Sequence, residues 1–192
     1  MTEVEPKPGL DGVIAAAKQA PGRGLPPVHL WNPAHSGEID IVITADGRWI
    51  HEGAAINRAP LVRLFSTVLR KDPDGYWLVT PAEKMKITVD DAPFIAIALD
   101  QDHDAAGRPI LRFTTNVGDV VEAGPDNALR VEIDPVTQEP RPYVHVRRGL
   151  EALVSRPVFY ELAAMADEQD GMLSVESAGL RFPIGPVEAP VS

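Results

Sequence analysis

The sequence predicts an α+β fold made of two strand-rich halves that repeat one strand–helix–strand motif. Short segments in which apolar and polar residues alternate recur along the chain, and each ends at a turn sequence, as is typical of β-strands. Two other segments carry apolar residues at helical spacing, and an Asp-Gly turn follows each of them. The length of 192 residues suits one large domain or two small ones that share a core.

The N-terminal part begins with a short helix and a hairpin. Leu10–Ala20 is rich in alanine and ends at Pro21-Gly22, which predicts a helix that stops there. Isoleucine occupies every second position from 39 to 43, and Asp46-Gly47 turns the chain into a returning strand, Arg48–Glu52. Asp-Gly between two such segments is a strong hairpin signal, because both turn positions favour positive φ.

The returning strand leads into the first of the two repeated helices. Alternation predicts that Ile50 faces the core and that Trp49 and His51 lie on the opposite face. Asn57 is predicted to cap a helix that has Pro60 in its first turn. We expect this helix to continue until the turn sequence that begins at Asp72. Two strands follow, Tyr76–Thr80 and Lys84–Val89.

The C-terminal part is richer in strands and contains the second repeated helix. That helix runs from about Arg156 to Ala166, and its apolar stripe includes Val158 and Leu162. Strands are predicted at Phe94–Leu99, Ile110–Thr115, Ala128–Ile133, Tyr143–Val146, Met172–Val175 and Leu180–Ile184, with a short piece at Val120-Val121. The predicted segments are an N-terminal helix and linker (1–36), an N-terminal α+β half (37–92), a C-terminal strand-rich half (93–185) and a frayed tail (186–192).

An order of short sequences occurs twice along the chain. A strand containing His51 or His145 comes first, and then Asn57-Arg58 or Ser155-Arg156, each with a proline close behind. A helix, an Asp-Gly turn and another strand complete both copies. We interpret this order as the duplication of a domain-like unit. The alternative is that capped strand–helix–strand units are common and recur without shared ancestry.

Composition and charge limit the functions and the cellular compartment that the sequence allows. The chain has no cysteine, which excludes disulfides, thiolate metal sites and cysteine nucleophiles. Neither a signal peptide nor a membrane-spanning stretch is visible, so we expect a cytoplasmic protein. The formal net charge is −10, and residues 93–192 alone contribute 8 basic and 16 acidic residues. Long nucleic acids are poor partners for such a protein, whereas a short anionic ligand needs only one local basic site.

The motifs in the sequence indicate no cofactor and no clear enzymatic activity. His51-Glu52 resembles the start of a zinc-protease motif, but position 55 is alanine and the second histidine is missing. Asp100, Asp102 and Asp104 resemble the start of a calcium loop whose later ligands are absent, and an acidic hairpin tip explains them better. We therefore expect no metal site, and a hydrolase or transferase that uses His51 and Glu52 is the alternative to a binding protein.

One basic stretch favours anion binding. Residues 58–71 are predicted to be helical and carry Arg58, Arg63, Arg70 and Lys71 without an acidic residue, and Lys84 projects from a nearby strand. Guanidinium groups together with flat aromatic side chains are typical of sites for phosphate-bearing ligands that contain a base. Trp49, His51 and Trp77 are candidates for the aromatic part. The alternatives are a solvated helix face above core tryptophans, or a surface that binds an acidic protein.

Several longer sequences resemble a bacterial family of unknown function, the one numbered 1285. These sequences are Gly37–Ile41, Asp46–Gly53, Ile56–Arg58, Leu61–Ser66, Leu78–Lys84, Val89–Phe94 and Phe113–Asp119. The similarity extends from about Gly37 to Ile184. It implies a two-part fold with duplicated motifs and a C-terminal half like a pleckstrin-homology barrel. It also implies a nucleotide-like ligand between the halves and a role in signalling.

The resemblance also marks the residues that we expect at a ligand site. They are Trp49, His51, Glu52, Arg58, Thr80, Glu83, Lys84, Asp91, Thr115, Asn116 and Asp119. We expect Arg58 and Lys84 to hold an anion, and Trp49 or His51 to stack on a base. Asn116 and Glu83 would then form hydrogen bonds with the base or the sugar. The leading hypothesis is a regulatory or signal-transduction module, and a protein-interaction domain is a further alternative.

Overall fold

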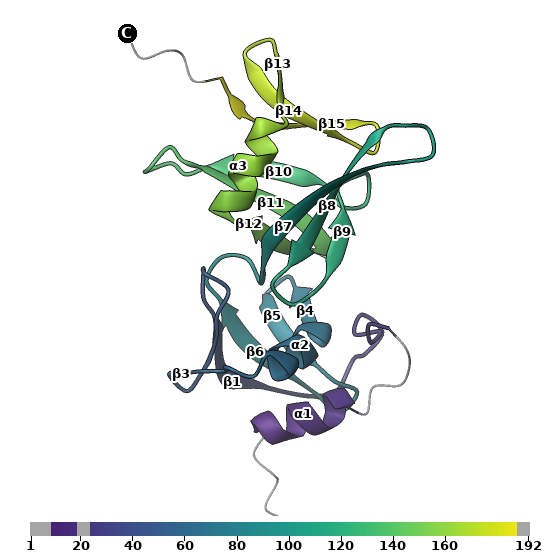
Figure 1. Cartoon of the computed structure of the whole chain (residues 1–192). Coiled ribbons are helices and arrows are strands. Elements are labelled where there is room, and N and C mark those ends of the chain that lie inside the picture. The colour runs from purple at the N-terminus through teal and green to yellow at the C-terminus, as the bar shows by residue number, and fades with distance from the viewer. Residues whose placement is uncertain (1–8, 19–23, 188–192) are drawn as a thin grey trace, which may run out of the picture. The chain divides into compact units, whose positions relative to one another are not determined.

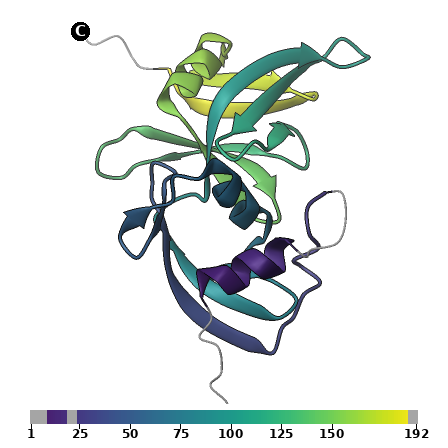
Figure 2. The same cartoon turned by 60° about the horizontal axis from the view of Figure 1, so that its bottom comes forward.

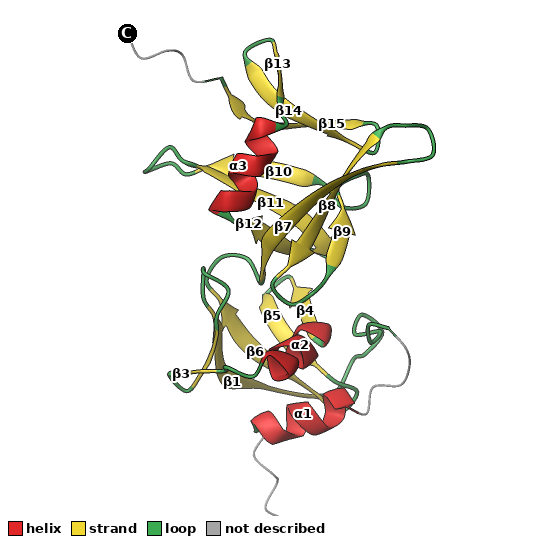
Figure 3. Cartoon of the chain, in the orientation of Figure 1, coloured by secondary structure: helices red, strands yellow, loops and turns green. Residues whose placement is uncertain are grey.

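The computed structural model describes residues 9–18 and 24–187 and divides the chain into two units, Met1–Asp91 and Ala92–Ser192. Each unit contains a curled six-stranded sheet and few helices, which confirms the predicted strand-rich α+β fold (Figures 1 and 3). The predicted signal-free N-terminus, the stop at Pro21-Gly22 and the last five residues of the predicted tail lie outside the described residues. No helix of the described residues is long and apolar enough to span a membrane.

The first unit combines one sheet with two helices. The helices are α1 (Leu10–Lys18) and α2 (Ala59–Thr67). The strands are β1 (His35–Ile43), β2 (Trp49–His51), β3 (Ala54–Ala55), β4 (Leu69–Asp72), β5 (Gly75–Val79) and β6 (Glu83–Val89). They pair in the order β3-β2-β1-β6-β5-β4, in which only β1 and β6 are parallel. Figure 2 shows the two helices beside this sheet.

The hairpin β1–β2 has a register that the sequence reading missed. Ile43 pairs with Trp49 and Ile41 with His51, so both aromatic side chains share the face of the buried isoleucines. Trp49 is a core residue, and Ile50 lies on the other face. The prediction that Ile50 faces the core and Trp49 faces away from it was therefore wrong. The backbone of Thr44 pairs with that of Arg48, so the loop has three residues instead of two, and a shift of one residue moves every side chain to the other face.

The helix α2 is also shorter than predicted. It ends at Thr67, and Leu69–Asp72 is strand β4, which pairs with β5. The hydroxyl groups of Ser66 and Thr67 donate to the carbonyls of the preceding turn, as such residues do where a helix ends. The prediction of a continuous basic helix over residues 58–71 is therefore wrong, because Arg58 precedes the helix and Arg70 and Lys71 lie on a strand.

The second unit contains two sheets and one helix, α3 (Arg156–Ala164). Six strands form a sheet that curls into half a barrel (Figure 1). They are β7 (Phe94–His103), β8 (Pro109–Thr115), β9 (Val120–Glu122), β10 (Leu129–Ile133), β11 (Pro140–Arg147) and β12 (Leu150–Val154). Their order is β10-β11-β12-β7-β8-β9. The likeness to a pleckstrin-homology barrel stays a prediction.

A separate three-stranded sheet completes the second unit. Its strands are β13 (Asp167–Gln169), β14 (Met172–Ser177) and β15 (Leu180–Pro186), all antiparallel. Pro186, which we expected to begin the tail, is the last residue of β15, and the Val187 N–H donates to the Gly171 carbonyl. The acidic tip predicted between β7 and β8 is confirmed. There Asp104 accepts hydrogen bonds from the backbone of Ala106 and Arg108.

The duplication is visible in the order of the elements. Three antiparallel strands, one nine-residue helix and three more antiparallel strands occur as β1–β2–β3–α2–β4–β5–β6 and again as β10–β11–β12–α3–β13–β14–β15. Both helices have proline as their second residue. The copies differ at one place. In the first unit β1 pairs with β6, whereas the corresponding β10 and β15 belong to different sheets.

Ser177 joins the two sheets of the second unit. Its side chain is fully buried, and its Oγ accepts the Leu111 N–H at 2.9 Å and donates to the Ala123 carbonyl at 2.6 Å. Ser177→Ala leaves both buried backbone groups without this partner, so we expect it to lower the free energy of unfolding by about 2 kcal/mol. Urea denaturation measures the loss. A matched control is Ser155→Ala, because Ser155 makes no side-chain cap hydrogen bond within the described residues and should cost under about 0.5 kcal/mol. Equal effects of the two variants would contradict the prediction.

Candidate functional site

The predicted site residues of the first unit do not share one surface. His51 lies on the helix-covered face of the sheet, because it pairs with buried Ile41. Lys84 lies on the opposite face, two residues from Lys86, which pairs with Trp77. Glu52 is exposed in the turn after β2, and Arg58 is exposed just before α2. Within this unit Lys84 is therefore separated from His51 by the sheet itself.

Trp49 is unavailable for stacking on a ligand. It is 2% exposed, and its ring lies 6.0 Å from that of Phe65 at an interplanar angle of 21°. This burial counts against the stacking role predicted for Trp49, because the three-residue hairpin loop turns its side chain into the core. Its indole N–H is buried without a hydrogen-bond partner among the described residues.

Lys84 is part of a cluster on the outer face of the sheet. Its Nζ lies 4.2 Å from the centre of the Trp77 ring and 3.6 Å from an Asp72 carboxylate oxygen. Asp72 in turn accepts two hydrogen bonds from Arg70, at 2.7 and 2.8 Å. These hydrogen bonds from Arg70 hold the pKa of Asp72 below its usual value. Each charged group of the cluster has a partner within it, which indicates a structural role.

Thr80 and Glu83 meet in the turn between β5 and β6. Thr80 is fully buried, and its hydroxyl donates to the Glu83 carbonyl and accepts the Glu83 N–H. The Glu83 side chain is half-buried against α1, since one carboxylate oxygen lies 3.3 Å from the position of a Cβ added at Gly12. Asp91, the last residue of the first unit, is half-buried.

The three predicted residues of the second unit lie in one turn. The Thr115 Oγ accepts the Asp119 N–H at 3.1 Å, and the Asn116 side-chain oxygen accepts the Ile95 N–H at 3.0 Å. Asp119 also forms an ion pair of 2.6 Å with Arg147. Hydrogen bonds between side chains and backbone fix this turn after β8, which explains these residue types without a ligand. A site between the two halves stays a prediction.

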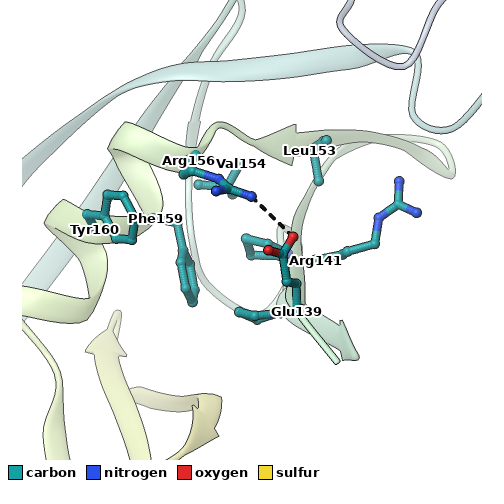
Figure 4. Close-up of a pocket in the computed structure, with 9 residues that line it drawn as sticks. Glu139, Arg141, Leu153, Val154, Arg156, Phe159 and Tyr160 are labelled. Atoms are coloured by element: carbon teal, nitrogen blue, oxygen red, sulfur yellow. Dashed lines mark hydrogen bonds and ion pairs between the residues drawn. The ribbon is translucent and has the colours of Figure 1, made fainter. Parts of the chain in front are cut away.

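The second unit contains a hollow that the sequence reading did not single out. Its volume is about 270 Å³, and it lies between the first turns of α3 and the beginning of β11 (Figure 4). Its lining is mostly apolar or aromatic, and two arginines and one glutamate contribute charge. The residues are Glu139, Pro140, Arg141, Pro142, Leu153, Val154, Arg156, Phe159 and Tyr160. An apolar cavity with a few polar groups is the usual form of a small-molecule site.

An ion pair spans the mouth of this hollow. Arg156, the first residue of α3, donates to the Glu139 carboxylate at 3.1 Å, and the two side chains are 68% and 59% exposed. Figure 4 shows the Phe159 ring beside this pair and the Arg141 guanidinium turned away from it. A pair as exposed as this one contributes at most about 1 kcal/mol, so an incoming anion can replace Glu139 at little cost.

The second arginine is held by an aspartate. Arg141 lies 3.9 Å from Asp134, whose carboxylate accepts the N–H groups of Thr137 and Val136. The N–H of Thr137 and then that of Val136 lower the pKa of Asp134. Arg156 is the better anion-binding group of this hollow, because the guanidinium of Arg141 is turned away from the Arg156–Glu139 pair and from Phe159 (Figure 4). No set of three or more acidic or histidine side chains suited to a metal occurs in residues 9–18 and 24–187.

A signal for this site was present in the repeat. Arg156 follows Ser155 as Arg58 follows Asn57, and both arginines stand at the N-terminal end of the repeated helix. Residue spacing alone does not distinguish Arg156 from Arg58 as the anion-binding residue. The hollow in the second unit requires the hairpin β10–β11 to bring Glu139 and Pro140 to the helix, and that contact is not readable from the sequence.

Comparison with known proteins agrees with this architecture. Residues 26–92 match a domain of unknown function, the N-terminal domain of DUF1285, and residues 93–184 match its C-terminal domain. The chain belongs to the DUF1285 family. A DUF1285 family protein from Silicibacter pomeroyi DSS-3, known from a crystal structure, is 46% identical with a TM-score of 0.83 over 92% of this chain and 96% of that one.

A second DUF1285 crystal structure, from Shewanella baltica OS155, is 23% identical, covers 65% of this chain and 90% of its own, and has a TM-score of 0.49. No curated protein matches the chain. The family membership that the sequence resemblance predicted is thus confirmed, and the family is one of unknown function.

Proposed function

We propose that this protein is a regulatory or signal-transduction module that binds a small anionic ligand in the hollow between α3 and β11. The observation that carries the proposal is Arg156, an exposed guanidinium at the mouth of an apolar hollow of about 270 Å³. Its planar fork suits a carboxylate or phosphate. Phe159 and Tyr160 offer aromatic contact area beside it, so a nucleotide-like ligand fits the proposal. We place this activity in the cytoplasm, in keeping with a chain that has no cysteine.

A thermal-shift screen tests the proposal. Mono-, di- and cyclic nucleotides and small carboxylates are added to the full chain, and a ligand at 100 times its dissociation constant adds about 2.7 kcal/mol of stability. We expect Arg156→Gln to reduce the shift of any ligand that binds. The matched control is Arg58→Gln, the corresponding position of the other copy, which is also exposed.

The control also distinguishes the two sites. A shift that survives Arg156→Gln and disappears in Arg58→Gln would contradict the hollow of the second unit and favour the site predicted from the resemblance. A screen without any shift, repeated by isothermal titration, would remove the binding proposal altogether.

The enzyme alternative has its own test. His51 is half-buried and Glu52 is exposed in the following turn, where its φ is 49°. A hydrolase or transferase that uses this pair would turn over phosphatase or esterase substrates and lose that activity in His51→Ala. The protein-interaction alternative, in contrast, loses the basic helix on which it depended.

A further inference from the structure

A second hollow adjoins the one described above. It has a volume of about 390 Å³, and Pro140 and Phe159 line both. Among the described residues that line it, Gln138 is the only one with a polar side chain. The remaining residues are Ile133, Ala163, Leu173, Ile184, Gly185 and Pro186. The two hollows are therefore neighbours, with charge at the Arg156 end of the first and a mostly apolar lining in the second.

The duplication explains why this second hollow exists. In the first unit β1 and β6 pair in parallel, and Ile43 at the end of β1 lies beside Val89 at the end of β6. The corresponding strands β10 and β15 approach each other but belong to different sheets. The second hollow is lined by residues from the ends of both, Ile133 and Ile184. Ile133 is 45% exposed, so apolar surface that strand pairing would cover is left open.

We infer that the ligand is an elongated amphiphile, with an anionic head at Arg156 and a straight apolar chain that passes Phe159 into the second hollow. This inference rests on the proposed function and names its ligand class. A carboxylate head matches the guanidinium, which can release Glu139 at little cost. A flexible chain that passes Phe159 would reach both neighbouring hollows, whereas a compact rigid ligand would fill only the first.

The expected signature is a dependence of affinity on chain length. The probes are straight-chain alkanoates from butanoate to dodecanoate, measured by isothermal titration below the concentration at which they form micelles. Burial of each added methylene tightens binding about fourfold, as long as the chain still enters the hollow. We expect this rise for the natural sequence and a weaker affinity at every length for Arg156→Gln.

A side chain that fills the second hollow should stop the rise of affinity with chain length, and only for alkanoates long enough to reach that hollow. Ala163→Phe places a ring in that hollow from α3, and we expect long alkanoates to bind this variant no better than short ones. The matched control is Ala164→Phe, because the next residue is exposed and lines neither hollow. Leu173→Phe, from β14, makes the same test if Ala163→Phe does not fold.

The outcomes separate this inference from the proposed function. If Arg156→Gln weakens binding but Ala163→Phe and Leu173→Phe keep the rise with chain length, the elongated ligand is overturned and the anion site stands. The same holds if nucleotides bind and no alkanoate does. If Arg156→Gln changes the affinity of none of the probes, the proposed function fails and the inference fails with it.

Discussion

Replacing Trp49 by alanine is expected to lower the free energy of unfolding by about 3–5 kcal/mol. The side chain is 2% exposed and stacks on Phe65 of α2, so its removal opens a cavity where α2 packs on the sheet. The hairpin register leaves no alternative position for this side chain, because Trp49 pairs with buried Ile43. Chemical denaturation followed by far-ultraviolet circular dichroism measures the loss.

Trp49→Phe is the informative comparison. It keeps an aromatic ring against Phe65 and removes the indole N–H, which has no partner within the described part of the chain. A buried donor without a partner is unfavourable, so its removal offsets part of the lost burial. We expect Trp49→Phe to cost less than half as much as Trp49→Ala. A stable Trp49→Ala variant that had lost only ligand binding would instead restore Trp49 as a site residue.

Arg70→Met is expected to cost about 2–4 kcal/mol. Arg70 is 15% exposed, donates twice to Asp72, and donates to the carbonyls of Val28 and Trp31. The methionine keeps the apolar stem, leaves two carbonyls without their donor, and leaves Asp72 with Lys84 as its remaining cationic partner. The segment before β1 then loses these two hydrogen bonds to β4. The control is Arg63→Met, an exposed position on α2, where we expect a change within about 0.5 kcal/mol.

The pH dependence of Arg70→Met gives a second readout. Because the Arg70 hydrogen bonds lower the pKa of Asp72 below 3.8 in the folded state, the pair contributes stability above that value. This contribution is lost as pH falls through the folded pKa of Asp72. The difference in stability between the natural sequence and Arg70→Met should thus narrow below about pH 4. A difference that stays constant from pH 7 to pH 3 would contradict the role given to this ion pair.

Local signals in the sequence predicted most elements, and one-residue details decided the errors. The hairpin at Asp46-Gly47 was found, but a three-residue loop reversed the facing of Trp49. Apolar residues at Val68 and Leu69 continued the helical spacing of α2, although that segment pairs with β5 instead. Pairing between strands overrode the local helical pattern there. The backbone N–H and C=O groups of Leu69–Asp72 form hydrogen bonds with β5 instead of within a longer helix.

Two strands of the second unit lacked a readable signal. Asp167–Gln169 is exposed along its whole length, so β13 shows no alternation between apolar and polar residues. Leu150–Val154 follows a tight turn at Arg148-Gly149, and its five residues alone do not distinguish a strand from a helix. The candidate site was missed for a related reason. Arg156 stood out in the repeat, but the residues opposite it come from a hairpin that local spacing does not place.

The separation of β10 from β15 has a consequence for the behaviour of the chain in concentrated solution. Strand β10 lies at the edge of its sheet, where one row of backbone groups can pair with a strand of another molecule. Its side chains Arg130 and Glu132 are exposed and form an ion pair with each other. Charged side chains at such an edge oppose intermolecular strand pairing. The separation of β10 from β15 that leaves the second hollow open therefore also creates a risk of aggregation, which this pair of charges limits.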